Sequence, residues 1–233
     1  MKPEKSQFSL LRRLWPLVMV AAFAVTFLSL APKSPSAKPR SEKTASKTAA
    51  TDKISKGMAV ITLGGGCFWS MEAIYERLQG VQSAEPGYAG GKTKNPTYEQ
   101  VGKGDTGHAE AVNVIYDPKK ISYGEMVEIL LTVLDPTTLN AQGADVGTNY
   151  RSVIFYRTPD EKKVAQETIK KIEVKKIWSA PIVTQVAPID RFYRAEDYHV
   201  GYFNANSTAP YCRAVITPKL DKLRENFGDK LKK

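Results

Sequence analysis

The amino-acid composition changes sharply near Gly57, and this break confines the folded part of the chain to residues 58–233. Between residues 32 and 57 the chain consists mainly of Ser, Lys, Thr, Ala and Pro, with almost no large apolar side chain. Such a segment cannot bury enough apolar surface to offset the entropy lost on ordering it. We therefore predict a flexible linker over 32–57 and one folded domain over 58–233.

A single apolar segment precedes the linker. Leu14–Leu30 carries no charge, follows Arg12-Arg13 and ends before Ala31-Pro32. As a helix it would span roughly 26 Å, close to the hydrocarbon thickness of a bilayer. We predict that residues 1–31 are a basic leader with an uncleaved membrane anchor, and a cleaved signal peptide is the alternative.

The arginine pair and the short N-terminal tail favour a cytoplasmic N-terminus, although basic residues flank both sides of the apolar segment. This orientation predicts a membrane-anchored protein whose folded domain lies outside the cytoplasm, on the periplasmic or extracytoplasmic side. Secretion after signal cleavage is the alternative.

The formal net charge of +10 is unevenly distributed. Residues 1–57 hold 11 Lys and Arg against three acids, so the leader and linker carry +8 and the domain only +2. A nearly neutral domain argues against a nucleic-acid partner. The two cysteines exclude a disulfide-rich scaffold.

Strand-like and helix-like segments alternate within the domain. Short apolar runs predict strands, and apolar residues at helical spacing predict helices. The predicted strands are 58–63, 109–116, 150–157 and 182–186, and the predicted helices are 68–80, 122–134, 158–176 and 218–227. Ser122 with Glu125 matches a capping box, and Thr158-Pro159 is a typical helix start. We expect one α/β or α+β domain.

The run Gly-Gly-Gly-Cys-Phe-Trp at 64–69 places a thiol where a strand ends and a helix begins. The glycines allow a sharp turn, and free backbone N–H groups with the helix dipole favour a thiolate. We expect a lowered pKa for Cys67, which makes it a candidate nucleophile beside an apolar wall of Phe68 and Trp69. An inert buried cysteine is the alternative.

The second cysteine, Cys212, lies 145 positions after Cys67. If the two thiols meet, they can cycle between dithiol and disulfide, and an inert buried cysteine is again the alternative. His108 and His199 lack the close ligand pairs of a zinc site, so we expect no metal. A thiol hydrolase with either histidine as base, and a membrane-tethered binding module, are the rival functions.

Acids and phenols gather in three glycine-punctuated segments, which span 87–98, 104–110 and 142–150. Long loops of this kind are where sites are commonly assembled. The candidate site residues are Tyr98, Glu110, Asp145 and Tyr150. A solvated turn residue is the alternative for each of the acids taken alone.

The same segments resemble a known family. The strings GGGCFW, GYAGG with PTYEQV, GDTGHAEAV and QGADVGTNYRS occur in the order and spacing of the A-type peptide methionine sulfoxide reductases. The resemblance runs from about Met58 to Phe203. It implies a single α+β domain with a mixed, ferredoxin-like sheet. It also implies an oxidoreductase that reduces methionine-(S)-sulfoxide, free or in oxidised proteins, and repairs oxidative damage without a metal or bound cofactor.

Carried over by position, the resemblance implies that Cys67 attacks the sulfoxide sulfur and becomes a sulfenic acid. Phe68 and Trp69 would hold the methyl group, and Glu110 would donate a proton to the sulfoxide oxygen. This agrees with the chemistry, because the oxygen must gain protons and an acid with a raised pKa near the thiol can supply them.

The resemblance also implies that Tyr98 and Tyr150 donate hydrogen bonds to the oxygen and that Asp145 orders the polar side of the site through water. Cys212, after a tyrosine, matches the position of a resolving cysteine in many relatives, although the flanking sequence departs from the commonest form. Direct attack of an external thiol on Cys67 is the alternative. A thioredoxin-like dithiol would supply the electrons.

Overall fold

The computed structural model of the protein describes residues 54–233. The predicted leader and anchor over 1–31 and nearly all of the predicted linker lie outside the described residues. Between Ile54 and Lys233, no helix combines the length and the apolar character needed to cross a bilayer.

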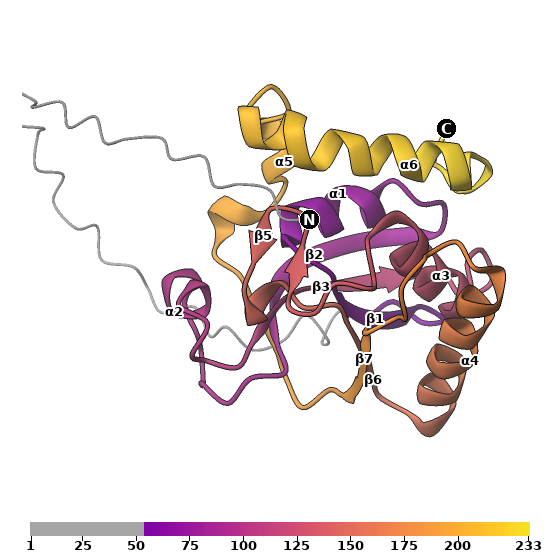
Figure 1. Ribbon diagram of the computed structural model, residues 1–233, viewed down its shortest axis with the longest axis horizontal. Coiled ribbons are helices and arrows are strands. Elements are labelled where there is room, and N and C mark those ends of the chain that lie inside the picture. Colours follow the sequence, from indigo (N-terminus) through magenta and orange to yellow (C-terminus); the bar gives the residue numbers. More distant parts are fainter. Residues whose placement is uncertain (1–53) are drawn as a thin grey trace, which may run out of the picture. The chain divides into compact units, whose positions relative to one another are not determined.

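A six-stranded sheet forms the centre of the domain, with the strand order β7-β6-β1-β3-β2-β8 (Figure 1). The strands are β1 (Ala59–Gly64), β2 (Val81–Ala89), β3 (Ala109–Tyr116), β6 (Val153–Tyr156), β7 (Gln185–Pro188) and β8 (Phe192–Arg194). β6 and β7 are parallel and the other neighbours antiparallel, so the sheet is mixed. β4 (Ala141–Gln142) and β5 (Asp145–Val146) form a separate two-stranded sheet.

The helices are α1 (Phe68–Glu76), α2 (Tyr98–Gly102), α3 (Tyr123–Val133), α4 (Pro159–Lys175), α5 (Tyr202–Ala205) and α6 (Thr217–Phe227). A π-helical turn, Cys212–Ile216, leads directly into α6, and short 3₁₀ turns cover Thr148–Tyr150, Asp197–His199 and Gly228–Lys230. α6 runs along α1, and α4 packs beside α3 (Figure 1).

Apart from the short elements α2, β4 and β5 and a 3₁₀ turn, the chain from β1 to β6 runs β-α-β-β-α-β through β1, α1, β2, β3, α3 and β6. The four strands lie in the order β6-β1-β3-β2. This is the ferredoxin-like arrangement, in which each helix connects two strands that are not hydrogen-bonded to each other. The predicted α+β class and mixed sheet are therefore confirmed.

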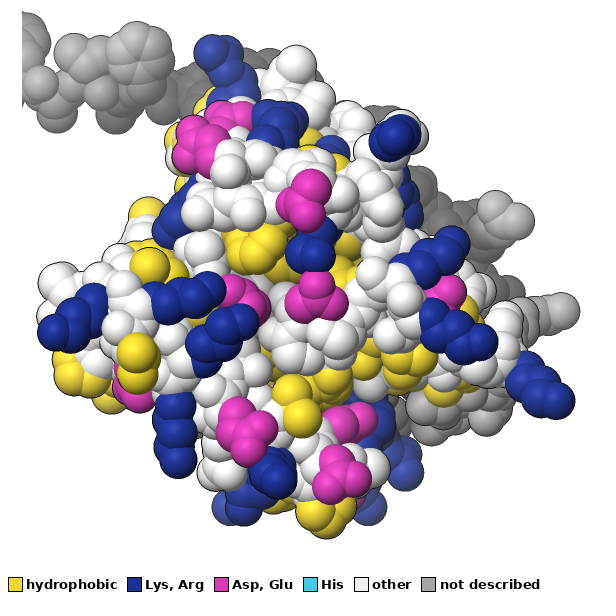
Figure 2. Space-filling view, turned by 90° about the vertical axis from the view of Figure 1, so that its right-hand side faces the viewer, with side chains coloured by type: hydrophobic (Ala, Val, Ile, Leu, Met, Phe, Trp, Pro, Cys, Tyr) yellow, Lys and Arg dark blue, Asp and Glu magenta, His cyan; other side chains and the backbone are white. Residues whose placement is uncertain are grey.

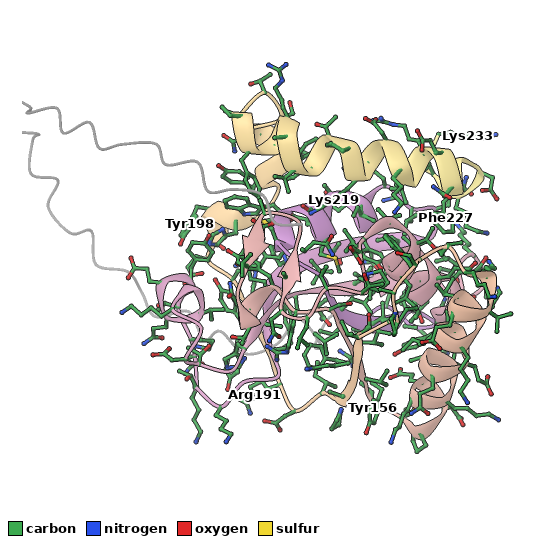
Figure 3. The ribbon with its side chains drawn as sticks, in the orientation of Figure 1. Tyr156, Arg191, Tyr198, Lys219, Phe227 and Lys233 are labelled. Carbon is green, nitrogen blue, oxygen red and sulfur yellow. The ribbon has the colours of Figure 1, made fainter. Side chains whose placement is uncertain are left out.

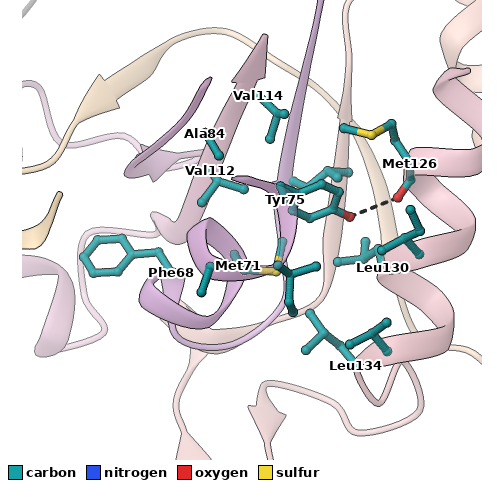
Figure 4. Close-up of a cluster of buried hydrophobic side chains, with 14 of the residues drawn as sticks. Phe68, Met71, Tyr75, Ala84, Val112, Val114, Met126, Leu130 and Leu134 are labelled. Carbon is teal, nitrogen blue, oxygen red and sulfur yellow. Dashed lines mark hydrogen bonds between the residues drawn. The ribbon is translucent and has the colours of Figure 1, made fainter. Parts of the chain in front are cut away.

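One large apolar cluster fills the space between the sheet and helices α1 and α3 (Figure 4). Met71 and Tyr75 of α1 pack there with Val112 and Val114 of β3. The buried Tyr75 hydroxyl donates to the carbonyl oxygen of Met126 at 2.9 Å, so its polar group is satisfied. This packing fixes α1, and with it the turn that contains Cys67 at its N-terminus, against the sheet.

The sequence predicted most of the longer elements but missed β2 and β8 of the main sheet, and it also missed the short elements α2, α5, β4 and β5. Pro86 and Gly87 lie within β2, and both residue types are depleted in strands. Pro86 is tolerated because β8 pairs only with Gly87–Ala89, so Pro86 lies in the part of β2 that has one neighbouring strand. Gly87 allows the close approach of β8, because a Cβ atom there would lie 2.3 Å from the carbonyl oxygen of Tyr193. Tyr150, predicted to begin a strand, instead ends a 3₁₀ turn before β6.

Charged side chains of both signs are interspersed on the face of the domain that includes α4 (Figure 2). On this helix, Lys171 and Lys175 both bind the Glu128 carboxylate of α3, at 3.0 and 2.6 Å. The mixed pattern matches the small net charge of the domain and differs from the single-sign stripe of a nucleic-acid interface.

Candidate active site

The turn between β1 and α1 places Cys67 at the N-cap of α1. Gly66 adopts a φ of +87°, and a Cβ atom there would lie 2.6 Å from Cγ of Gln142, so glycine is required. The Gly66 N–H donates to the carbonyl oxygen of Tyr150 at 3.1 Å. The turn therefore joins the thiol to the loop that precedes β6.

Glu110 of β3 is buried beneath this turn. Its Oε2 accepts a hydrogen bond from the Phe68 N–H at 3.0 Å, across 42 residues of sequence. Burial raises the pKa of Glu110 to about 8, while the Phe68 N–H acts in the opposite direction. At neutral pH the carboxyl is therefore mainly protonated and can donate a proton, as expected for this residue.

The Cys67 thiol is only 5% exposed, and its pKa is raised to about 12. Burial is the main cause and the Glu110 carboxylate the next, while hydrogen bonds from the Tyr211 hydroxyl and the Trp69 amide lower the value. The expected lowering of the Cys67 pKa is therefore wrong for the free enzyme. The physical reason is that the first free amide of α1 serves Glu110, and a thiolate at this depth is poorly solvated.

Two further phenols lie within electrostatic reach of the thiol and of Glu110. The pKa of Tyr98 is raised, and that of Tyr150 is raised to about 12. For both phenols burial is the largest cause and the charge of Glu110 is the second. Both hydroxyls are therefore protonated donors at neutral pH. The structure thus brings together the residues that the sequence singled out: Cys67, Phe68, Trp69, Tyr98, Glu110, Asp145 and Tyr150.

Tyr211 is a site residue that the sequence did not identify. Its hydroxyl donates to Oδ2 of Asp145 at 2.9 Å and also contacts the Cys67 thiol. Its ring meets Trp69 edge-on at 5.9 Å. The available signal was its position next to Cys212, but only tertiary packing shows that it is the tyrosine that reaches the thiol.

The apolar side of the site is built around Trp69. Its indole stacks on Tyr202 of α5 with ring centroids 3.6 Å apart, and its Nε1–H donates to Nδ1 of His199 at 3.1 Å. Phe68 stacks on Tyr98 with centroids 6.1 Å apart. These contacts hold two aromatic rings beside Cys67, where an apolar methyl group can be accommodated.

Cys212 begins the π-helical turn and is fully buried. Both cysteines are free thiols, and burial raises the pKa of Cys212. Its neighbour Tyr211 reaches the active site, whereas the Cys212 side chain packs in the main apolar cluster. In this state the structure does not join the two cysteines.

Both histidines have other partners. Nδ1 of His108 accepts from the Gly91 N–H at 3.1 Å, and its Nε2 donates to the carbonyl oxygen of Thr93 at 2.8 Å. Nδ1 of His199 accepts from Trp69. Within residues 54–233, no group of three or more His, Cys, Asp or Glu side chains is placed to hold a metal ion.

Residues 59–231 match the family model described as peptide methionine sulfoxide reductase. The chain belongs to this family. It is an oxidoreductase that uses a thiol to reduce methionine sulfoxide, as the resemblance implied. Membership in the family rules against the hydrolase and the binding module.

Curated relatives match over nearly their whole length. The chain is 50% identical over 173 residues to peptide methionine sulfoxide reductase MsrA of Sulfolobus acidocaldarius, covering 74% of this chain and 97% of that protein. The same enzyme from Picrophilus torridus is 51% identical over 172 residues, covering 74% and 97%.

Solved structures also match. The reduced form of Mxr1 from Saccharomyces cerevisiae has a TM-score of 0.61 and 34% identity, covering 67% of this chain and 90% of that one. Methionine sulfoxide reductase A of Corynebacterium diphtheriae has a TM-score of 0.59 and 32% identity, covering 66% and 78%.

Proposed function

We propose that Cys67 attacks the sulfur of methionine-(S)-sulfoxide while Glu110 protonates the sulfoxide oxygen. The buried carboxyl of Glu110, with its pKa near 8, is the observation that carries this proposal. A protonated Glu110 bears no charge, so it donates a proton and no longer opposes ionisation of Cys67. In balance, the thiol and the sulfoxide become a Cys67 sulfenic acid and methionine, as the oxygen passes from one sulfur to the other.

Phe68 and Trp69 hold the methyl group of the substrate, and Tyr98 and Tyr150 donate hydrogen bonds to its oxygen. The two stacked rings and the two protonated phenols support this division of the site into an apolar and a polar side. Asp145 orders the polar side and orients Tyr211. The substrates are methionine sulfoxide in oxidised proteins and as the free amino acid.

This step is tested by measuring the rate at which the protein consumes each sulfoxide diastereomer, with dithiothreitol as the reductant. We expect the S form to be consumed and the R form to persist. Turnover of the R form at a similar rate, or an active Cys67→Ser variant, would overturn the assignment.

The sulfenic acid on Cys67 requires a second thiol. We propose that Cys212 attacks it, which releases water and forms a Cys67–Cys212 disulfide, and that a thioredoxin-like dithiol then supplies two electrons to regenerate both thiols. Two features support this step: Tyr211 already brings the adjacent segment to Cys67, and Cys212 starts a π-helical turn. Such turns interrupt regular helices, often at functional sites.

A single turnover without reductant tests the role of Cys212. Mass spectrometry should find a Cys67–Cys212 disulfide in the wild type and a persistent Cys67 sulfenic acid in Cys212→Ala. A sulfenic acid that persists equally in both proteins would instead assign resolution to an external thiol.

We propose further that residues 1–31 anchor the enzyme in a membrane, with the catalytic domain on the extracytoplasmic side. The uncharged segment Leu14–Leu30 and the preceding arginine pair support this location. Cell fractionation and N-terminal sequencing test it. We expect an intact N-terminus in the membrane fraction, whereas a soluble form starting near Pro32 would indicate a cleaved signal peptide.

A further inference from the structure

Lys219, in the first turn of α6, lies beside the active-site turn although its helix is far from it in the sequence. Figure 3 shows Lys219 on the side of α6 that faces α1. Its Nζ donates to Oγ of Ser70 at 3.2 Å, and Ser70 is fully buried in the first turn of α1. The side chain of Lys219 thus brings a cation towards the protein interior.

The position of Ser70 places this cation close to Cys67. Ser70 lies three residues after Cys67, and its N–H donates to the Cys67 carbonyl oxygen at 3.0 Å. Because Ser70 lies in the first turn of α1 and Cys67 is the N-cap of that helix, the Lys219 amine is held at the same end of α1 as the thiol.

The charges around Cys67 explain what this cation can do. Glu110 and Asp145 both disfavour the thiolate, and the hydrogen bonds from Tyr211 and from the Trp69 amide favour it. The phenols of Tyr98 and Tyr150, whose pKa values are raised, stay neutral around it. A thiolate formed in this environment needs a compensating positive charge.

Lys219 provides that charge. Burial lowers its pKa, and the negative charges of the Cys67 thiolate and Asp145 act in the opposite direction. The Lys219 ammonium and the Cys67 thiolate attract each other when both are charged, so the ammonium favours the thiolate.

We propose that Lys219 is a positioning residue whose ammonium group, held by Ser70, stabilises the Cys67 thiolate. The C-terminal segment then contributes two groups to the nucleophile: the hydroxyl of Tyr211 from the start of the π-helical turn and the ammonium of Lys219 from α6. The inference rests on the proposed role of Cys67 as nucleophile.

The test measures Cys67 itself rather than sulfoxide reduction. The rate of Cys67 alkylation by iodoacetamide is followed against pH by peptide mass spectrometry, in wild type and in Lys219→Met. We expect the apparent pKa of Cys67 to rise by about one pH unit in Lys219→Met, with about tenfold slower alkylation below that pKa. Lys219→Arg keeps the charge and should restore most of the wild-type curve.

Lys222→Met is the matched control, because it removes the same charge from the same helix. The Lys222 ammonium lies over the Trp178 ring, 4.3 Å from its centroid, and should leave the Cys67 curve unchanged. Ser70→Ala frees the amine and should produce a smaller shift in the same direction. This variant carries the test if Lys219→Met does not fold.

Three results would overturn the proposal. The first is an alkylation curve of Lys219→Met that equals the wild-type curve, and the second is a shift in Lys222→Met as large as that in Lys219→Met. The third is slower alkylation in both Lys219→Met and Lys219→Arg with no change in the apparent pKa of Cys67. The last would mean that Lys219 acts through packing. A different result would separate this proposal from the proposed function. If the wild-type protein did not reduce sulfoxides but Lys219→Met still shifted the alkylation curve, the role of Cys67 would be contradicted and the role of Lys219 would stand.

Discussion

The two cysteines are both almost inaccessible to solvent, but the polar groups around the two sulfur atoms differ. Cys67 is 5% exposed and Cys212 is fully buried. At Cys67, an amide and a hydroxyl point at the sulfur and two carboxyl groups lie nearby. At Cys212, burial alone shifts the pKa. Burial therefore does not distinguish a nucleophile from a packing residue, whereas the polar groups around the sulfur do.

The backbone differs between the two regions as well. Cys67 follows a tightly packed glycine turn, since a Cβ atom on Gly64 would lie 2.9 Å from the carbonyl oxygen of Glu110. Cys212 lies within a helical segment, at the point where its hydrogen-bonding pattern changes. The first thiol is therefore held in a tightly packed turn before a helix, whereas the second lies within a helical segment.

Replacement of each cysteine by serine, with dithiothreitol as the reductant, gives the largest expected effect. Cys67→Ser should lose at least about 10³-fold in kcat, because a hydroxyl cannot replace the thiol as nucleophile. Cys212→Ser should stay within about threefold of wild type, because dithiothreitol can attack the Cys67 sulfenic acid directly. Similar losses in the two variants would remove the contrast between the two regions.

Glu110→Gln tests the polar surroundings of Cys67. We expect kcat/KM to fall by about 10² to 10⁴-fold, because the proton donor is lost. The pKa of Glu110 is raised to about 8 and the protonated form is the active one, so wild-type kcat/KM should decline as pH rises through about 8. Rates measured from pH 6 to 10 should show this decline in wild type and its absence in the variant.

The same carboxyl links stability to pH. Its folded-state pKa, about 8, lies above the ordinary glutamate value of 4.5, so the folded protein binds this proton more tightly than the unfolded chain does. Its contribution to the free energy of unfolding is complete below pH 4.5 and is lost as pH rises through 8. Urea denaturation should show a weaker fall over this range in Glu110→Gln; equal slopes in both proteins would contradict the buried carboxyl.

The two serine variants should rank in the opposite order for stability: Cys212→Ser should lose more free energy of unfolding than Cys67→Ser, although Cys67→Ser loses more activity. Cys212→Ser places a hydroxyl in an apolar cluster and should lower the free energy of unfolding by about 1–3 kcal/mol. In Cys67→Ser, the Tyr211 hydroxyl and the Trp69 amide remain as partners for the new oxygen, so the loss should stay below about 1 kcal/mol. Urea titrations of the two variants measure the difference.

The smallest effect is expected at the apolar wall. Tyr202→Leu removes the stacking on Trp69, which is worth about 0.5–1.5 kcal/mol and corresponds to a rise in KM of about two- to tenfold. Steady-state kinetics with a peptide sulfoxide measure it. Tyr156→Leu in β6 is the matched control and should leave KM unchanged. A change in kcat alone would show that Tyr202 acts on Cys67 rather than on substrate binding.

Local patterns predicted much of the architecture. The capping box of Ser122 and Glu125 is present at the start of α3, and the glycine run at 64–66 forms the expected turn. These features depend on residues within a few positions of one another, which a single sequence displays directly. β2 was missed because pairing with β3, rather than its own composition, makes it a strand.

The sequence by itself determined where the first strand gives way to a helix, where the thiol is placed and, through its motifs, which acid accompanies it. Only the tertiary structure decided the ionisation of the site. Glu110 takes the first amide of α1 from 42 residues away, and Tyr211 and Lys219 arrive from the C-terminal segment. A pKa depends on burial and on charges brought close in space, so the expected low value at Cys67 became a high one once the chain had folded around it.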